Sequence, residues 1–139
     1  MRLALFAVAL LLFATPVLPD DENKHVKELM AAIKGKENRP AGEVFKNVQM
    51  MKDVPAGRFL KIMDTGFNKA LGTTCDHCHA EDRWEADEKR PKRAAREMMV
   101  LVNQINDSLQ KLQDIDTSDA TVNCTTCHRG YVKPATQMR

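Results

Sequence analysis

Two copies of a five-residue cysteine–histidine motif carry most of the chemistry that this sequence can offer. Residues 75–79 (CDHCH) and 124–128 (CTTCH) both have the spacing C-x-x-C-H, the attachment signature of c-type haem. Two thiols on about one turn of chain can form thioethers with the two vinyl groups on one edge of a porphyrin. The histidine beside the second cysteine then lies beneath the ring, where its imidazole can bind iron. The sequence therefore predicts two covalently bound haem c groups, attached at Cys75, Cys78, Cys124 and Cys127 and ligated by His79 and His128.

Three other uses of the same cysteines follow from the spacing. One zinc ion could bind all four thiolates, because a repeated C-x-x-C is also a zinc pattern. Two disulfides, or a redox-active C-x-x-C pair, would suit an oxidising compartment. None of these uses gives a role to the histidine that follows each pair, so haem attachment is the favoured interpretation.

The ligand on the other side of each iron separates an electron carrier from a catalyst. A methionine thioether stabilises ferrous iron and raises the potential, although methionines at helical spacing commonly just fill a core. Met63 lies 12 residues before Cys75, so its helix can fold back over the haem bound by the following loop. Met98 and Met99 lie 26 and 25 residues before Cys124. Their side chains point about 100° apart on a helix, and spacing does not choose between them.

Several other residues near the motifs have open roles. We expect His25 on a short helix far from either motif, where it is a minor candidate for a sixth ligand, and we expect His77 to be exposed. Trp84 could stack on a haem edge or cover the surface. The following basic side chains could pair with haem propionates or form a solvated face: Lys89, Arg90, Lys92, Arg93, Arg96 and Arg129.

Three helical stretches must position the two motifs. An apolar stripe predicts a short first helix that stops at Gly35: Val26, Leu29, Met30 and Ile33. Pro55 opens a second helix, which ends at residues 71–72 just before the first motif. The longest helix begins near Pro91 and carries apolar residues at helical spacing: Ala94, Ala95, Met98, Leu101, Val102, Ile105, Leu109 and Leu112. Segment 81–92 is dense in charges of both signs and is predicted to be a solvated connection.

No segment reads as a strand, so the predicted fold is all-α. We expect about three to four helices organised by haem, in two helix–turn–CxxCH units. The chain has only seven aromatic residues among 139, and two of them lie in the first 19. A domain with so few large side chains needs a large apolar cofactor to complete its core.

The first 19 residues read as an export signal. A short positive start, Met1-Arg2, precedes twelve apolar residues at positions 3–14. A transmembrane helix needs about 20 such residues, so an uncleaved anchor is the less favoured alternative. We therefore predict a signal peptide at 1–19, a di-haem cytochrome c domain at 20–139, and a periplasmic location. With 21 basic and 19 acidic residues the net charge is only +2, which argues against a nucleic-acid partner.

Four stretches resemble the cytochrome c subunit family of the bacterial photosynthetic reaction centre and the small exported cytochromes that share its domain. They are VFKNVQMMKDV (44–54), ALGTTCDHCH (70–79), AAREMMVLVNQIN (94–106) and VNCTTCHRG (122–130). The resemblance implies that a helix before each motif supplies a methionine ligand, Met63 for the His79 haem and Met98 for the His128 haem, with Met99 as packing. The chain departs from the family in having one pair of motifs instead of two, and no lipid-bearing cysteine. A reaction centre as partner therefore does not follow.

These observations predict an exported di-haem c-type cytochrome, an electron carrier and not an enzyme. It would pass single electrons by outer-sphere transfer between redox proteins, a membrane electron-transfer complex among them. A haem enzyme or gas sensor, such as a peroxidase, is the alternative and needs one labile sixth site. A structural or assembly subunit of a larger multihaem assembly is a third possibility. Oligomeric state is not predicted.

Overall fold

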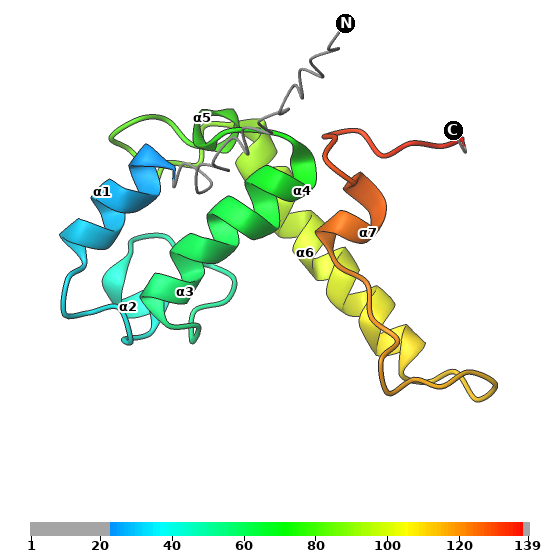
Figure 1. Ribbon diagram of the computed structural model, residues 1–139. Helices are drawn as coiled ribbons and strands as arrows, with labels where there is room; N and C mark the ends of the chain where they lie inside the picture. The colour runs from blue at the N-terminus through cyan, green and yellow to red at the C-terminus, as the bar shows by residue number, and fades with distance from the viewer. Residues whose placement is uncertain (1–22, 138–139) are drawn as a thin grey trace, which may run out of the picture.

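The computed structural model describes residues 23–137, and within that range the chain is helical (Figure 1). Strand pairing in this range is limited to two isolated bridges, Pro40 with Pro55 and Ala80 with Arg83. The elements in chain order are α1 (Lys24–Ala32), α2 (Ala41–Val44), α3 (Ala56–Lys61), η1 (Ile62–Asn68), α4 (Lys69–Leu71), α5 (Cys75–Cys78), α6 (Arg90–Leu109) and α7 (Cys124–His128). The all-α prediction is thus confirmed for the described part. The predicted signal peptide lies outside it.

Elements α3, η1 and α4 form one continuous helix from Ala56 to Leu71, with a π-helical middle. Together with α1 and α6 it makes the three helices that were predicted, of which α1 is the short one, while α2, α5 and α7 are single turns of four or five residues. The continuous helix ends at Gly72, whose φ of 62° lies in the left-handed region. Because the first motif begins three residues later, this turn sets the position of α5.

A small apolar core holds the N-terminal lobe, which we define as α1, α2 and α3. Val26 on α1 and Ile33, its C-cap residue, pack with Ala56 and Leu60 on α3, as the stripe on the first helix predicted. The rings of Phe45 and Phe59 stack with their centroids 5.7 Å apart. The described residues include just six buried hydrophobic side chains: Val26, Ile33, Ala41, Ala56, Leu60 and Ala70. Such a core is small for a domain of this length.

The long helix α6 begins near Pro91 as predicted, but its apolar residues are only partly covered by other parts of the polypeptide. None of its residues, all of which the structure describes, is buried. Met98 is 50% exposed, and Leu101 is 45% exposed. Within residues 23–137, no helix combines the length and hydrophobicity needed to cross a bilayer.

The two motif-bearing segments meet where α4 packs on the turn that follows α7. The amide N of Gly130 donates to the carbonyl of Ala70 at 2.8 Å. A side chain at Gly72 would place its Cβ 2.1 Å from the Gly130 carbonyl oxygen, so only glycine allows this approach. The C-terminal segment therefore folds back against the helix that leads into the first motif (Figure 1).

Candidate haem sites

The first motif forms a single helical turn whose cysteines face a cavity. Cys75 is the first residue of α5 and Cys78 is its last, and both are half-buried. The amides of Asn23 and Asn68 donate to Cys75 Sγ at 3.3 and 3.5 Å. Burial raises the pKa of the Cys78 thiol. The turn therefore presents two thiols on one edge of the cavity, as thioether attachment requires.

His79 follows this turn in extended conformation and is held by a backbone carbonyl. Its Nδ1 lies 2.8 Å from the carbonyl oxygen of Trp84. A proton on Nδ1 that is donated to this carbonyl leaves Nε2 for a metal, the arrangement found around most metal-bound histidines. Burial lowers the pKa of His79; the Trp84 carbonyl raises it, and the cations Lys92 and Arg96 lower it further. The ring is thus held in the neutral form that binds metals.

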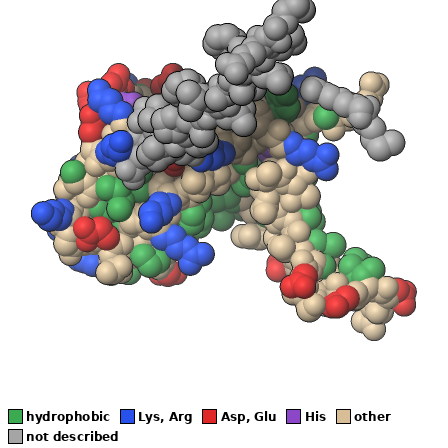
Figure 2. Space-filling view, viewed as in Figure 1, with side chains coloured by type: hydrophobic (Ala, Val, Ile, Leu, Met, Phe, Trp, Pro, Cys, Tyr) green, Lys and Arg blue, Asp and Glu red, His purple; other side chains and the backbone are tan. Residues whose placement is uncertain are grey.

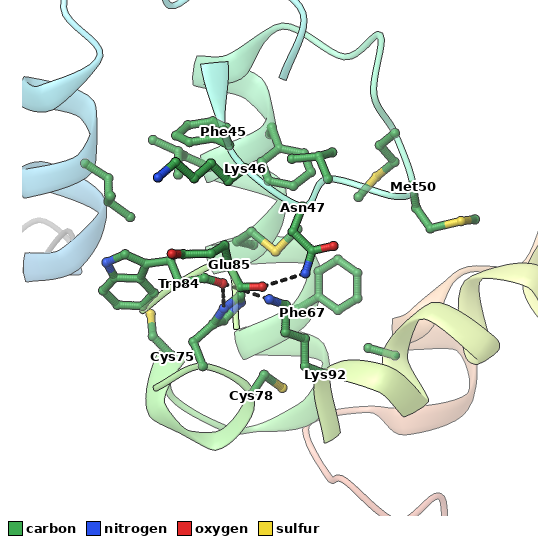
Figure 3. Close-up of a pocket in the computed structure, with 18 of the residues that line it drawn as sticks. Phe45, Lys46, Asn47, Met50, Phe67, Cys75, Cys78, Trp84, Glu85 and Lys92 are labelled. Carbon is green, nitrogen blue, oxygen red and sulfur yellow. Dashed lines mark hydrogen bonds between the residues drawn. The ribbon is translucent and has the colours of Figure 1, made fainter. Parts of the chain in front are cut away.

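A cavity of about 460 Å³ lies against this histidine (Figure 3). This volume is within the usual range for cofactor sites, about 300–1,000 Å³. The first motif lines it together with Met63, which the π-helical segment η1 carries. Other methionines and the aromatic residues around the cavity are Met50, Met51, Met99, Phe45, Phe59, Phe67 and Trp84. The structure therefore brings Met63 into the same cavity as Cys75, Cys78 and His79.

Two histidines differ from their predicted positions. His25 lines the same cavity as the first motif, so the expectation that it lies far from either motif is wrong. Its ring packs edge-on against Trp84 with centroids 5.2 Å apart, and the His79 ring lies 5.6 Å from the same indole. His77 is half-buried instead of exposed. The α1 helix reaches the site because it packs on α3, a contact that periodicity does not encode.

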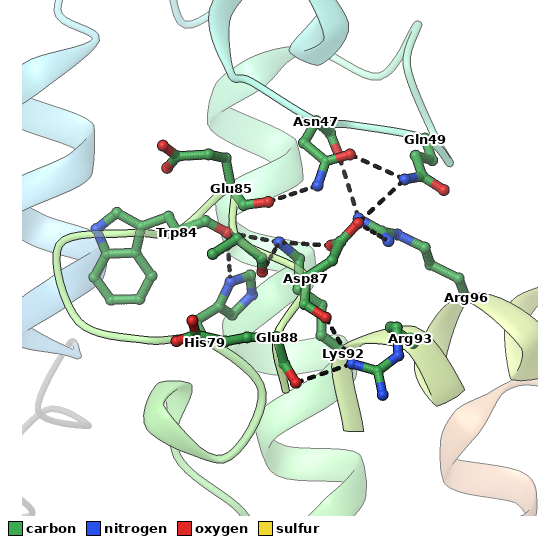
Figure 4. A network of polar contacts seen from close by, with 11 residues as sticks. Asn47, Gln49, His79, Trp84, Glu85, Asp87, Glu88, Lys92, Arg93 and Arg96 are labelled. Atoms are coloured by element: carbon green, nitrogen blue, oxygen red, sulfur yellow. Dashed lines mark hydrogen bonds and ion pairs between the residues drawn. The ribbon is translucent and has the colours of Figure 1, made fainter. Parts of the chain in front are cut away.

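The segment after the first motif is only in part the solvated connection that its charge density predicted. Six of its charged residues are exposed, whereas others are held in a network of ion pairs; the exposed ones are Glu81, Asp82, Arg83, Glu85, Glu88 and Arg90. Asp87 pairs through Oδ2 with Arg96 at 2.9 Å and through Oδ1 with Lys92 at 3.4 Å (Figure 4). The Arg96 guanidinium holds the pKa of Asp87 well below its usual range. The Lys92 and Arg96 side chains are 11% and 17% exposed. The side-chain amide of Asn47 also donates to the Glu85 carbonyl. These contacts hold the segment next to His79, whose ring is bonded to the Trp84 carbonyl.

The second motif forms α7, and a capping box starts this short helix. Asn123 Oδ1 accepts from the amides of Thr125 and Thr126, and the Thr126 hydroxyl accepts from the amide of Asn123. This arrangement satisfies amide groups that a free helix end would leave unpaired. His128 Nδ1 lies 3.0 Å from the carbonyl oxygen of Tyr131. Both motif histidines are therefore bonded at Nδ1 to a backbone carbonyl.

Met98 and Met99 face different surroundings. Met99 lines the cavity of the first motif, whereas Met98 does not line it and is half exposed. The segment before α7 is tied to the same helix by Asn106. The Asn106 amide donates to the Val122 carbonyl at 3.0 Å, and its oxygen accepts from the Val122 amide at 2.7 Å. The helix that carries Met98 is thus anchored directly to the chain that enters the second motif.

The donor set of the first site fits a haem. It combines two thiols on one turn, an imidazole with Nε2 directed away from its carbonyl partner, a thioether, and an apolar cavity. The alternatives are less well supported. In the described chain, no three His, Cys, Asp or Glu side chains gather closely enough to hold a metal ion, which disfavours one shared zinc. None of the four cysteines, all of them described, pairs in a disulfide.

Sequence reasoning missed the cap of α7 and the two carbonyls that hold the histidines. The cap could have been found, because Asn123 followed three residues later by Thr126 resembles a capping box. The Trp84 and Tyr131 carbonyls had no signal, since every residue has a carbonyl. The ion pairs of Asp87 also had no signal beyond the alternating charges of their segment.

Comparison with known proteins agrees with the resemblance found in the sequence. The family described as "Photosynthetic reaction centre cytochrome C subunit" matches residues 15–138. The photosynthetic reaction center cytochrome c subunit of Thermochromatium tepidum is 33% identical over 97 residues, which are 68% of this chain and 22% of that protein. The chain thus spans about a fifth of the length of this relative.

Proposed function

Because the chain belongs to the photosynthetic reaction centre cytochrome c subunit family, we propose that it is an exported di-haem c-type cytochrome that carries single electrons. The family consists of cytochrome c subunits, electron carriers and not enzymes, and this implies covalently bound haem c. The number of haems, their ligands and their partners are our own proposals. One observation carries the proposal of two haems, namely that both CxxCH histidines are bonded at Nδ1 to a backbone carbonyl.

At the first site, Cys75 and Cys78 would hold the porphyrin, and His79 and Met63 would bind its iron. The cavity that contains all four residues supports this assignment. Apolar neighbours such as Phe59 and Phe67 would cover the ring and exclude water. Exclusion of water favours the less charged ferrous state and so raises the potential.

At the second site, Cys124 and Cys127 would hold the porphyrin, and His128 and Met98 would bind its iron. Met99 lines the first cavity, and adjacent side chains on a helix point about 100° apart. Met98 is therefore directed elsewhere, and this supports Met98 over Met99 for the second iron. A porphyrin on this side would also cover apolar residues of α6 that the polypeptide leaves exposed.

A bound haem supplies one-electron chemistry between ferric and ferrous iron. The residues of this chain would keep that chemistry outer-sphere. With an imidazole and a thioether of this chain bound to each iron, a substrate would find no free ligand position. The contact between Gly72 and Gly130 would hold the two units in a fixed relation, so that an electron can enter near one motif and leave near the other.

Export to the periplasm is part of the proposal and rests on the apolar stretch at residues 3–14. The partners would be redox proteins, with a membrane electron-transfer complex among them, met through small transient interfaces. The charge distribution supports steered encounters. Residues 23–74 hold ten basic and five acidic side chains, whereas acidic side chains gather beyond the far end of α6 (Figure 2). Such asymmetry orients a charged partner before contact.

The experiment that tests the proposal is a count of haems in protein made by a host competent in cytochrome maturation. An alkaline pyridine spectrum and the intact mass should both give two haems per chain. The ferric protein should have the weak near-infrared band of methionine-ligated iron and should not bind carbon monoxide readily. High-spin iron with ready carbon monoxide binding would instead favour the haem enzyme or gas sensor. A colourless protein with the mass of the bare polypeptide would exclude both functions.

The assignment of Met63 has its own test. Met63→His replaces a thioether by an imidazole and should lower the midpoint of one haem by more than about 59 mV, a tenfold change in its redox equilibrium. The other haem serves as the internal control and should hardly change. A redox titration in which neither midpoint moves would exclude Met63 as a ligand.

A further inference from the structure

The carbonyl oxygen of Trp84 accepts two hydrogen bonds from groups of different charge (Figure 4). One donor is His79 Nδ1 and the other is Lys92 Nζ, each at 2.8 Å. The Lys92 ammonium also donates to the Ala86 carbonyl at 2.9 Å and lies 3.4 Å from Asp87 Oδ1. With its side chain only 11% exposed, Lys92 exchanges most of its water shell for these three oxygens.

We propose that Lys92 tunes the reduction potential of the haem ligated by His79, through the Trp84 carbonyl that the two side chains share. The inference rests on the proposed function and adds to it a residue of the cavity wall that sets the potential through His79 and not by binding the iron. Lys92 is thus a positioning residue that acts through His79.

The direction of the effect follows from the hydrogen bonds. A carbonyl that accepts from an ammonium gives up electron density to a charge-assisted bond. It then accepts more weakly from the Nδ1–H of His79, and the imidazole keeps less imidazolate character. A less basic imidazole donates less to iron, which disfavours the ferric state. Lys92 is therefore expected to raise the potential of this haem.

The surrounding contacts keep Lys92 in place. It lies in the first turn of α6, just after Pro91, whose fixed φ favours a helix start. Asp87 bridges Lys92 to Arg96, one turn further along the same helix. Trp84 O therefore faces an ammonium whose position is set by the helix and by the Asp87 carboxylate.

The test compares Lys92→Met with Lys89→Met in the haem-loaded protein. Lys89 is the matched control because its ammonium donates to the carbonyl of Asp76, within the same motif, and not to Trp84. Lys92→Met should shift the ferrous-to-ferric ratio of one haem about tenfold toward ferric at a fixed potential, a midpoint about 59 mV lower. Lys89→Met removes the same charge and should shift the ratio only about twofold.

A second readout follows the hydrogen bond itself. Paramagnetic NMR of the ferric protein observes the exchangeable Nδ1–H proton of His79. Its chemical shift should change in Lys92→Met and should stay the same in Lys89→Met. Lys92→Gln keeps an amide donor and removes the charge, and it is the variant to use if Lys92→Met loosens the segment over His79. Its midpoint should move in the same direction by a smaller amount.

The proposal is overturned if the Lys92 variants lower the midpoint by no more than Lys89→Met does, or if the Nδ1–H resonance does not move. The haem count and the near-infrared band of the unmodified protein are measured first. If the unmodified protein lacks the two haems or the near-infrared band, the proposed function is excluded. If they hold while the midpoints of the Lys92 variants match the control, only the role of Lys92 is excluded.

Discussion

A methyl group at position 72 tests the contact that joins the two motif-bearing segments. Gly72 has a φ of 62°, where an L-residue costs about 1–2 kcal/mol. Its new Cβ would lie 2.1 Å from the Gly130 oxygen, so the backbone must shift. Overpacking of this kind costs about 1–3 kcal/mol, and weakening the bond from Gly130 N to Ala70 O costs about 1 kcal/mol more. Gly72→Ala should therefore destabilise the protein by about 4 kcal/mol.

Gly35→Ala is the matched control. Gly35 has a φ of 82°, and nothing lies within 4 Å of a Cβ built there. Gly35→Ala should therefore lower the free energy of unfolding only by the cost of the left-handed backbone, about 1 kcal/mol. Urea unfolding of the haem-loaded proteins, followed by far-ultraviolet circular dichroism, gives the free energy of unfolding of each variant. If Gly72→Ala costs no more than Gly35→Ala, the close approach of the two segments does not contribute to stability and the reasoning is refuted.

Three further predictions concern the second motif. Asn123→Ala removes the cap of α7 and should cost about 1 kcal/mol of unfolding free energy, whereas an unchanged urea midpoint would show that the cap is dispensable. Asn106→Ala loses both hydrogen bonds to Val122 and should lower the free energy of unfolding by about 1–3 kcal/mol. Amide hydrogen exchange should become faster in the residues just before α7, and unchanged exchange there would contradict the prediction. Met98→Ala should lower the midpoint of the second haem by more than about 59 mV in a redox titration. Met99→Ala should leave that midpoint in place, and the reverse result would exchange the roles of the two methionines.

Much of the helical framework could be predicted because its signals are local. Pro55 and Pro91 stand next to the starts of two helices, and Gly72 ends one of them, since each residue restricts or permits particular backbone angles. The stripe that contains Val26 and Ile33 also packs in the core as predicted. The exposure of α6 could not be foreseen in the same way. Periodicity identifies an apolar face and does not identify what covers it.

The prediction of a solvated segment at 81–92 was only partly right, for a related reason. Its alternating charges are typical of a solvated loop, yet Asp87 pairs with Lys92 and Arg96 inside a network that also holds Asn47. His25 reaches the first cavity from a helix 50 residues before Cys75. Neither arrangement follows from local spacing, because each depends on how α1, α2 and α6 pack around the first motif.

The sequence by itself predicted the chemistry, because thioether attachment and the histidine ligand depend on five adjacent residues with a fixed spacing. Only the tertiary structure decided which groups surround that chemistry. Three such contacts are made by backbone carbonyl oxygens. The Trp84 oxygen accepts from His79 and from Lys92, and the Gly130 oxygen lies against Gly72. Backbone carbonyls are alike at nearly every position, so packing across the chain decides which donor or neighbour each one meets.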